Sequence, residues 1–425
     1  MSGFYVTNYD KFDINETNKY LFRRGQDYRI IDHIDNFSFI YNIFLLYGEN
    51  EIVFRNEYYA VFLDGIIFNS NDKSFSGLSK FLIDMYEEYG VYFTKKLDGE
   101  FSICFLDFNK KKIIFSKDVF GTKPLWYSNC NGVAISSYKS GLIANGKDYI
   151  RAQKNTTYVM DFSGNILQSF PILELDINQH KQSYEDWCNA LDAAVKKRII
   201  TNEYVGIGLS SGYDSGVIFC ALKKFTNNFL SMSFMGKETE DILKKRILLH
   251  QNAELLQYEE NEFLVSLKEL YKWCEPYSEE YFELLKDEAS VGLGIICKRL
   301  KKENIKIYFS GIEFSMSPFM EASVGGKKNS SIDIKLIEQF PSNLQNLDPW
   351  KYNDSFVYAE RDEYVCGCYG IQATYPLFDP ALVQEFLWLS AELKNQAYKA
   401  PIDFYFTKHK FPFSVEKAGF FVRDI

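Results

Sequence analysis

The chain has 425 residues, of which 46% are hydrophobic and 17% aromatic, so it is long and apolar enough for two domains with substantial cores and is not a disordered polymer. Its net charge of −9, without any basic block, makes nucleic acid and anionic membranes unexpected partners. The first residues lack the pattern of a signal peptide, no apolar run approaches membrane-spanning length, and the eight Cys fit reduced thiols, so we expect a cytoplasmic protein.

The first part of the chain, residues 1–175, has the pattern of a strand-rich domain. We predict paired strands over 51–69, a helix over 78–89, and two strands over 101–108 and 112–116 joined by a hairpin turn. Two sheets covered by helices fit this order of elements.

A polar linker over 176–182 precedes a second domain, residues 183–425. Ser183 and Asp186 predict a capping-box start of its first helix. Beyond it strands and helices alternate, which predicts a doubly wound parallel sheet with ligands outside the carboxyl ends of its strands. The strands are predicted over 204–209, 229–234 and 305–309, and the part from 341 onward is predicted to be mainly helical.

The loop Ser210-Ser211-Gly212-Tyr213-Asp214-Ser215 follows the first of these strands and precedes a helix. This order makes an anion cradle, because backbone N–H groups point outward with the positive end of the helix dipole behind them. The three serines add hydroxyl donors, whereas Asp214 would repel a phosphate unless a cation such as Mg²⁺ lies between them. A Ser/Gly turn with an N-capping Asp is the alternative interpretation.

The loop resembles the Ser-Gly-Gly-x-Asp-Ser pyrophosphate loop of ATP pyrophosphatases, with Ser211 in place of the first glycine. Further segments resemble the asparagine synthetase B family, which also contains β-lactam synthetases and lasso-peptide cyclases, and they occur in the family's order over nearly the whole chain. These segments are Arg24–Asp27, Leu97–Ser102, Ser116–Tyr127, Tyr375–Pro380 and Lys417–Phe420.

The resemblance implies an α+β architecture followed by an α/β one. Residues 1–175 would form the αββα sandwich of N-terminal-nucleophile amidotransferases. Residues 183–425 would form a doubly wound parallel-sheet ATP pyrophosphatase domain with a helical C-terminal part.

The resemblance also implies that the first domain has lost glutamine hydrolysis. Relatives that hydrolyse glutamine carry a cysteine nucleophile directly after the initiator Met, where this chain has Ser2. Their oxyanion-binding Asn-Gly aligns with Asp64-Gly65, where a carboxylate would repel the developing oxyanion. The segments expected to hold the carboxylate and amine of glutamine, 39–45 and 74–78, carry no charged residue. We therefore expect this domain to be structural, as in β-lactam synthetases.

In the second domain the resemblance implies an ATP site. The nucleotide-binding residues carried over are Leu209, Ser210, Ser211, Gly212, Tyr213, Asp214, Ser215, Ser233, Phe234, Ser310 and Gly311. Lys399 resembles the catalytic lysine of the family, whose ammonium would stabilise charge on the α-phosphate or on the tetrahedral intermediate. A solvated lysine in a lysine-rich terminal region is the alternative.

One departure concerns the metal. The family carries two acidic Mg²⁺ ligands; Asp214 matches the first, whereas Ser315 occupies the position of the second. Glu313 lies two residues earlier and is predicted to take over that role, with Asp214, if the loop is reshaped. The alternative is that Glu313 is an ordinary loop carboxylate beside a weakened metal site.

Glu363 and Tyr364 lie on a charged helical segment near the expected acceptor site. β-Lactam synthetases use a Tyr–Glu pair there as the base for a substrate amine, so we assign both residues a catalytic role. A solvated helix face is the simpler interpretation.

Together these features predict an ATP-dependent, AMP-forming ligase that forms an amide bond between a carboxylate and ammonia or a substrate amine, without glutamine hydrolysis, in specialised metabolism. The expected cofactors are ATP and Mg²⁺, and the expected partner is a small-molecule or peptide carboxylate, with a homodimer or a partner protein left open. The alternatives are a pseudoenzyme that serves as nucleotide sensor or scaffold, and activation followed by attack of a sulfur nucleophile at Cys366 or Cys368.

Overall fold

The computed structural model describes residues 2–9, 12–46, 49, 52–200, 203–235, 238–256, 260–276, 288–314, 340–344 and 355–414. Two units can be distinguished in it. Unit 1 comprises Met1–Glu174, Glu269–Phe282 and Glu363–Gln372, and unit 2 comprises Leu175–Lys268, Glu283–Asp362 and Ala373–Ile425. Unit 1 thus contains two segments from the stretch that the sequence assigned to the second domain, 269–282 and 363–372.

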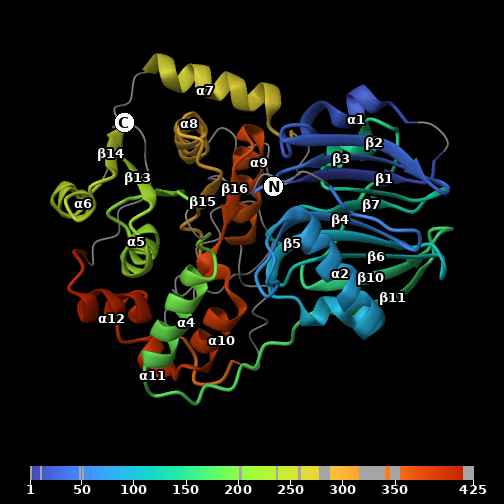
Figure 1. The fold of residues 1–425 in the computed structure, drawn as a ribbon. Coiled ribbons are helices and arrows are strands. Elements are labelled where there is room, and N and C mark those ends of the chain that lie inside the picture. Colours follow the sequence, from blue (N-terminus) through green and yellow to red (C-terminus); the bar gives the residue numbers. More distant parts are fainter. Residues whose placement is uncertain are drawn as a thin grey trace, which may run out of the picture. The chain divides into compact units, whose positions relative to one another are not determined.

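Unit 1 contains two antiparallel sheets (Figure 1). The six-stranded sheet has the order β2 (Tyr28–Ile34), β3 (Phe37–Ile43), β1 (Gly3–Thr7), β8 (Ala134–Ser136), β7 (Trp126–Ser128) and β9 (Ile150–Arg151). The five-stranded sheet has the order β11 (Ile166–Pro171), β10 (Thr156–Asp161), β6 (Lys112–Lys117), β5 (Gly99–Asp107) and β4 (Tyr59–Ile67).

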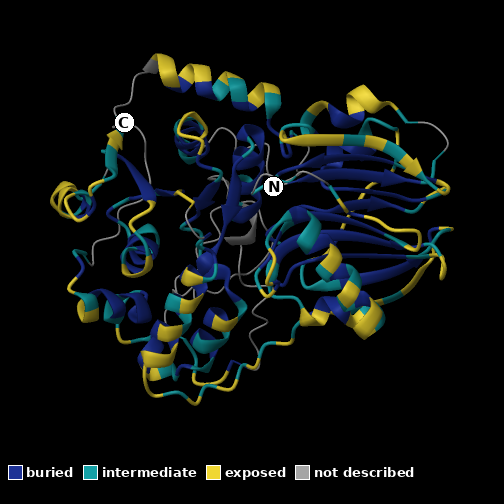
Figure 2. Ribbon diagram, in the orientation of Figure 1, coloured by how far each residue is buried: buried dark blue, intermediate teal, exposed yellow. Residues whose placement is uncertain are grey.

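The core of unit 1 lies between these two sheets. Phe39 of β3 and Phe62 of β4 meet across it with ring centroids 5.2 Å apart. Helices cover the outer faces, so the central strands β1 and β5 are buried on both sides whereas the edge strands β2 and β11 are partly exposed (Figure 2). The helices are α1 (Ile14–Leu21) and α3 (Lys139–Ile143) on the six-stranded sheet, and α2 (Phe75–Tyr89) with the 3₁₀ helix η1 (Gly90–Lys96) on the other. The αββα sandwich is confirmed.

Unit 2 is built on a five-stranded sheet with the order β14 (Ala253–Leu256), β13 (Phe229–Phe234), β12 (Val205–Gly208), β15 (Ile307–Phe309) and β16 (Gln372–Thr374). The pairs β13–β14, β12–β13 and β12–β15 are parallel, which confirms the doubly wound prediction. The glycines of β12 let helix α8 (Glu288–Lys302) approach the sheet, since a Cβ on Gly206 would lie 2.3 Å from a side-chain carbon of Leu300.

The helices of the second part of the chain follow the predicted alternation. They are α4 (Glu185–Lys196), α5 (Tyr213–Phe225), α6 (Glu240–Ile247), α7 (Glu260–Trp273), α8 (Glu288–Lys302), α9 (Ser355–Tyr369), the 3₁₀ helix η3 (Pro376–Phe378), α10 (Pro380–Trp388), α11 (Ala391–Lys394) and α12 (Ala400–His409). The division between the units falls within α7 and within α9. No helix in the described ranges is long and apolar enough to cross a membrane.

Two local predictions were wrong, and two short strands were missed. The paired strands expected over 51–69 are the single strand β4 with one bridge from Arg55 to Ala60, because the Asn56 side chain accepts hydrogen bonds from Tyr58 N and Tyr59 N and turns the chain. The capping box at Ser183 is absent, since its hydroxyl accepts from Glu185 N at 3.2 Å and α4 begins one residue later than expected. The short strands β14 and β16 were not predicted.

Candidate functional site

The candidate site lies in unit 2 at the carboxyl edge of the parallel sheet. Because β12, β13 and β15 run in the same direction, the segments that follow them leave the sheet at one edge. Gly311, which follows β15, approaches the Ser210–Ser215 loop closely enough that a Cβ on it would lie 3.2 Å from Ser215 N. The structure therefore brings these two predicted segments together.

The Ser210–Ser215 loop is held in shape by its own hydroxyl groups. The hydroxyls of Ser210 and Ser215 lie 2.7 Å apart, and Ser215 Oγ also accepts from Ser210 N at 3.0 Å. Gly212 N donates to Ser210 Oγ at 3.1 Å, and α5 begins at Tyr213. The first N–H groups of a helix have no acceptor within the helix, so the turn can receive an anion.

Lys399 connects the loop with Glu313. Its ammonium forms an ion pair with Asp214 and a second one with Glu313 Oε1 at 2.6 Å. The lysine is 6% exposed, so the interpretation as a solvated terminal lysine was wrong. The three residues come from α5, from the segment after β15 and from the residue preceding α12.

The backbone and the charges around Lys399 are both unusual. Lys399 has φ 49° and ψ 50°, a left-handed conformation that costs a non-glycine residue about 1–2 kcal/mol. Burial alone would lower the pKa of its ammonium, but Asp214 and Glu313 raise that pKa above its ordinary value. Burial and the charge of Asp214 raise the pKa of Glu313 to about 8, although Lys399 opposes that shift.

The residues present fit a magnesium ion. Oε2 of Glu313 is buried and has no hydrogen-bond partner among the described residues, while its other oxygen faces Lys399. No group of three or more His, Cys, Asp or Glu that could hold a metal occurs in the described ranges. Two carboxylates suit Mg²⁺, which is commonly held by one or two carboxylates together with substrate phosphates.

Two residues at the loop were missed by the sequence reasoning. Glu238 accepts from Ser211 N at 2.5 Å and from the Ser211 hydroxyl. Arg246 of α6 donates to the carbonyls of Ser210 at 2.6 Å and Gly212 at 2.7 Å. Burial raises the pKa of Glu238 and lowers the pKa of Arg246 to about 10.

The remaining predicted nucleotide residues are buried parts of the same sheet edge. Leu209 N donates to Met232 O at 2.7 Å, which ties the start of the loop to β13. Ser233 lies in β13 with Phe234, and its hydroxyl is buried without a hydrogen-bond partner among the described residues. Ser310 is fixed by its hydroxyl, which donates to Asp362 Oδ2 at 2.7 Å.

Some predicted features lie outside the described residues. These are Ser315, which stands where relatives carry an acidic ligand, and the Lys417–Phe420 segment. The Tyr375–Pro380 segment is described, and its Asp379 has a structural function. Asp379 caps α10 through Ala381 N and pairs with Arg198 at 2.8 Å.

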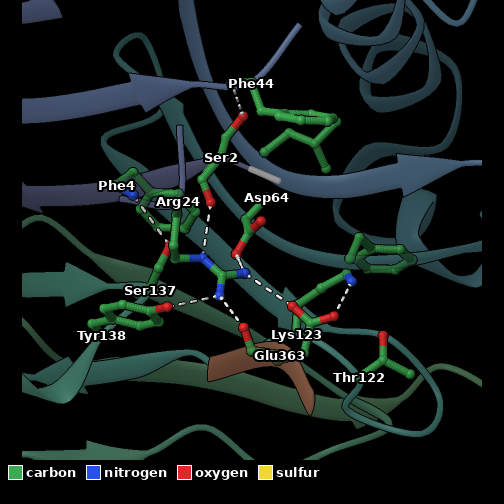
Figure 3. A network of polar contacts seen from close by, with 12 residues as sticks. Ser2, Phe4, Arg24, Phe44, Asp64, Thr122, Lys123, Ser137, Tyr138 and Glu363 are labelled. Atoms are coloured by element: carbon green, nitrogen blue, oxygen red, sulfur yellow. Dashed lines mark hydrogen bonds and ion pairs between the residues drawn. The ribbon is translucent and has the colours of Figure 1, made fainter. Parts of the chain in front are cut away.

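Unit 1 contains a second cluster of charged residues, centred on Arg24 (Figure 3). The guanidinium donates to Asp64 Oδ2 at 2.5 Å, to Glu363 Oε2 at 3.1 Å, to Tyr138 Oη at 3.1 Å and to the carbonyl of Ser2 at 3.1 Å. These three charged side chains have no exposed surface. Burial alone would lower the pKa of Arg24, but Asp64, Tyr138 and Glu363 raise it.

The predicted catalytic residues Glu363 and Tyr364 belong to unit 1. Glu363 forms ion pairs with Arg24 and with Lys123, and Tyr364 packs edge-on against Tyr138 with ring centroids 5.3 Å apart. Burial raises the pKa of Glu363, and the two cations offset part of that rise. Both side chains are fully buried rather than on a solvated helix face, and these contacts are of a structural kind. Their role as a base remains a prediction.

The residues at the expected glutaminase site also make structural contacts. Ser2 Oγ accepts from Phe44 N at 3.1 Å, and Asp64 pairs with Arg24. Ile43 is a fully buried core residue of β3, and Ser74 is the N-cap of α2. Cys366 and Cys368 are likewise buried, in α9.

Comparison with known sequences gives two family matches in chain order. One is described as a glutamine amidotransferase domain and matches residues 52–168, and the other is described as asparagine synthase and matches residues 187–312. The residues outside these two ranges are not part of either match.

Individual relatives are distant. A protein of Methanocaldococcus jannaschii assigned as glutamine-hydrolyzing asparagine synthetase 1 is 23% identical over 361 residues, which cover 75% of this chain and 61% of that protein. The glutamine-hydrolyzing asparagine synthetase of Cricetulus griseus is 24% identical over 275 residues, 54% of this chain and 47% of that one. The chain therefore matches less than two thirds of the length of either relative.

Among solved structures, a glutamine phosphoribosylpyrophosphate amidotransferase from B. subtilis matches with a TM-score of 0.32 at 11% identity, over 53% of this chain and 64% of that one. The two family matches, their order and the asparagine synthetase relatives together support an asparagine synthetase-like family protein.

Proposed function

We propose that the chain is an ATP-dependent ligase that activates a carboxylate as an acyl-adenylate and joins it to ammonia or to an amine of the substrate. The observation that carries the proposal is the position of Lys399, which is buried between Asp214 and Glu313 beside the hydroxyl-rich loop. A lysine in a strained backbone conformation between two carboxylates is costly to maintain, and such residues cluster at functional sites.

The residues at the carboxyl edge of the unit 2 sheet would act at different steps of the reaction. A carboxylate oxygen of the substrate attacks the α-phosphorus of ATP. The bond between the α-phosphorus and the oxygen that bridges it to the β-phosphorus breaks, and pyrophosphate leaves with that oxygen. The loop hydroxyls of Ser210 and Ser215 and the N–H groups at the start of α5 would hold the pyrophosphate. The Lys399 ammonium would offset the charge that develops on the α-phosphate. The amine then attacks the acyl carbon, AMP leaves, and the amine gives up a proton.

Asp214 and Glu313 are the residues that would hold Mg²⁺. The ion would neutralise phosphate charge and orient the phosphate oxygens. The unpartnered Oε2 of Glu313 supports this assignment, since a buried carboxylate oxygen without a donor is costly unless a cation or a proton satisfies it.

The nitrogen donor is proposed to be ammonia or a substrate amine rather than glutamine. The contacts of unit 1 support this. Asp64, which aligns with the oxyanion-binding Asn of relatives, is neutralised by Arg24 and is not a donor. Ser2 Oγ is engaged by the backbone of Phe44. Neither arrangement favours attack on a glutamine amide.

The substrate is proposed to be a small-molecule or peptide carboxylate of specialised metabolism. The family resemblance places Thr374 of β16 where an arginine is expected. Thr374 is 3% exposed, and its hydroxyl has no partner among the described residues. An uncharged residue there does not favour aspartate, because the second carboxylate of aspartate would lack a cation.

The direct test is pyrophosphate release from Mg-ATP with a panel of candidate carboxylates, with ammonium or glutamine as nitrogen source. The proposal predicts carboxylate-dependent release that glutamine does not increase and that Lys399→Met removes. Glutamine-dependent formation of glutamate would overturn the proposed loss in unit 1. Binding of Mg-ATP without release for any carboxylate would favour the alternative of a nucleotide sensor.

A further inference from the structure

The peptides of the Ser210–Ser215 loop are turned in a fixed direction by Arg246. Its guanidinium donates to the carbonyl oxygens of Ser210 and Gly212, and its Nε donates to Pro412 O at 2.9 Å. In a planar trans peptide the C=O and the following N–H point in opposite directions. The N–H groups of Ser211 and Tyr213 therefore point away from Arg246.

Arg246 cannot easily change this geometry. The residue is fully buried, its guanidinium carbon lies 4.9 Å from the ring centroid of Phe411, and a Cβ on Gly216 would lie 2.6 Å from its Nη1. A guanidinium offers several donors in one plane, which allows one side chain to hold two carbonyls at once.

A carboxylate lies on the opposite side of the Ser210–Ser211 peptide. Glu238 accepts from Ser211 N at 2.5 Å and from the Ser211 hydroxyl, and that hydroxyl in turn accepts from Thr239 N at 3.0 Å. An N–H that points outward from the turn before a helix is the group that a phosphate oxygen would use. The Glu238 carboxylate thus lies in the direction in which the Ser211 N–H points.

We infer that Arg246 is a positioning residue that aims the loop N–H groups at the nucleotide, and that the Glu238 carboxylate holds the place of a pyrophosphate oxygen, which displaces it on binding. The inference rests on the proposed function, because it concerns the same loop. It makes Glu238 a competitor of the ligand, so the charge of Glu238 lowers the affinity for pyrophosphate.

The test is calorimetric titration of inorganic pyrophosphate with Mg²⁺ into the full chain. Glu238→Ala is expected to bind about tenfold more tightly than the wild type, a difference of about 1.4 kcal/mol. Ser211→Gly keeps the N–H but removes one hydrogen bond to Glu238, so it is expected to shift in the same direction by a smaller factor. Glu240→Ala is the matched control, since Glu240 lies two residues further along the chain, at the start of α6, and pairs with the exposed Lys244; the affinity of this variant should equal that of the wild type.

Arg246→Lys keeps the charge but not the planar set of donors, so it is expected to weaken binding about tenfold in the folded fraction. A merely structural role would lower the number of competent sites in the titration and leave the dissociation constant unchanged, and that result would overturn the positioning role.

Equal or weaker binding by Glu238→Ala would overturn the competition while leaving the proposed function intact, provided that the wild type binds pyrophosphate. Absence of binding by the wild type and by every variant would overturn both. Binding by Glu238→Ala alone would support the inference.

Discussion

The cluster around Arg24 leads to a prediction of large magnitude. Replacing Arg24 by Met removes one cation from a group in which Asp64, Glu363 and Lys123 have no exposed side-chain surface. Methionine keeps much of the volume but donates no hydrogen bond. Asp64 and Glu363 each lose a charge-assisted bond, and breaking a buried pair in this way costs about 3–5 kcal/mol.

The assay is urea unfolding of the full chain, followed by circular dichroism. The expected result for Arg24→Met is a loss of about 3–5 kcal/mol in the free energy of unfolding of unit 1. The control is Arg55→Met, which removes an exposed pair with Asp32 at 3.3 Å in the same unit and should cost less than about 1 kcal/mol. If both variants lose the same small amount, water reaches the cluster and the reasoning from burial is refuted.

Three further predictions concern unit 2. Asp379→Asn keeps an N-capping side chain but removes the pair with Arg198, so it should lose about 3 kcal/mol at pH 7. Burial alone would raise the pKa of Asp379, but Arg198 holds that pKa below its ordinary value of 3.8. The stabilisation by this pair is therefore present above pH 3.8 and is lost as the pH falls through the pKa of the folded protein. Equal stability of the wild type and Asp379→Asn at pH 7 would contradict this prediction. Gly216→Ala should weaken pyrophosphate binding about tenfold by pushing Arg246 from the loop, and an unchanged dissociation constant would contradict the fixed guanidinium. Lys399→Met should reduce turnover at least about hundredfold while Mg-ATP still binds, and turnover at the wild-type rate would remove Lys399 from the chemistry.

The main architecture was predictable because it depends on local patterns. The strand before Ser210, the small hydroxylated turn and the following helix are contiguous, so periodicity and turn composition suffice to find them. The short strands β14 and β16 were missed because three or four residues carry too little periodicity, and because their pairing depends on distant parts of the chain.

The contacts of the charged residues could not be predicted in the same way. In α6, Lys244 is exposed and Arg246 is buried, but both look alike in a charged helical segment. Glu363 was assigned from its helical neighbours, whereas its partners Arg24 and Lys123 lie 339 and 240 residues away in sequence. Gly216 is a sequence feature that could have indicated the position of Arg246, since a glycine within a helix can mark the close approach of another group, here the Arg246 guanidinium.

The central claim is that the carboxyl edge of the unit 2 sheet binds ATP through its pyrophosphate and a magnesium ion. Calorimetric titration of Mg-ATP into the full chain and into its Asp214→Asn variant tests it most directly. The wild type is expected to bind at one site, and the variant at least about tenfold more weakly because it loses one carboxylate ligand. Equal affinity of the two proteins, or no binding by the wild type, would contradict the claim.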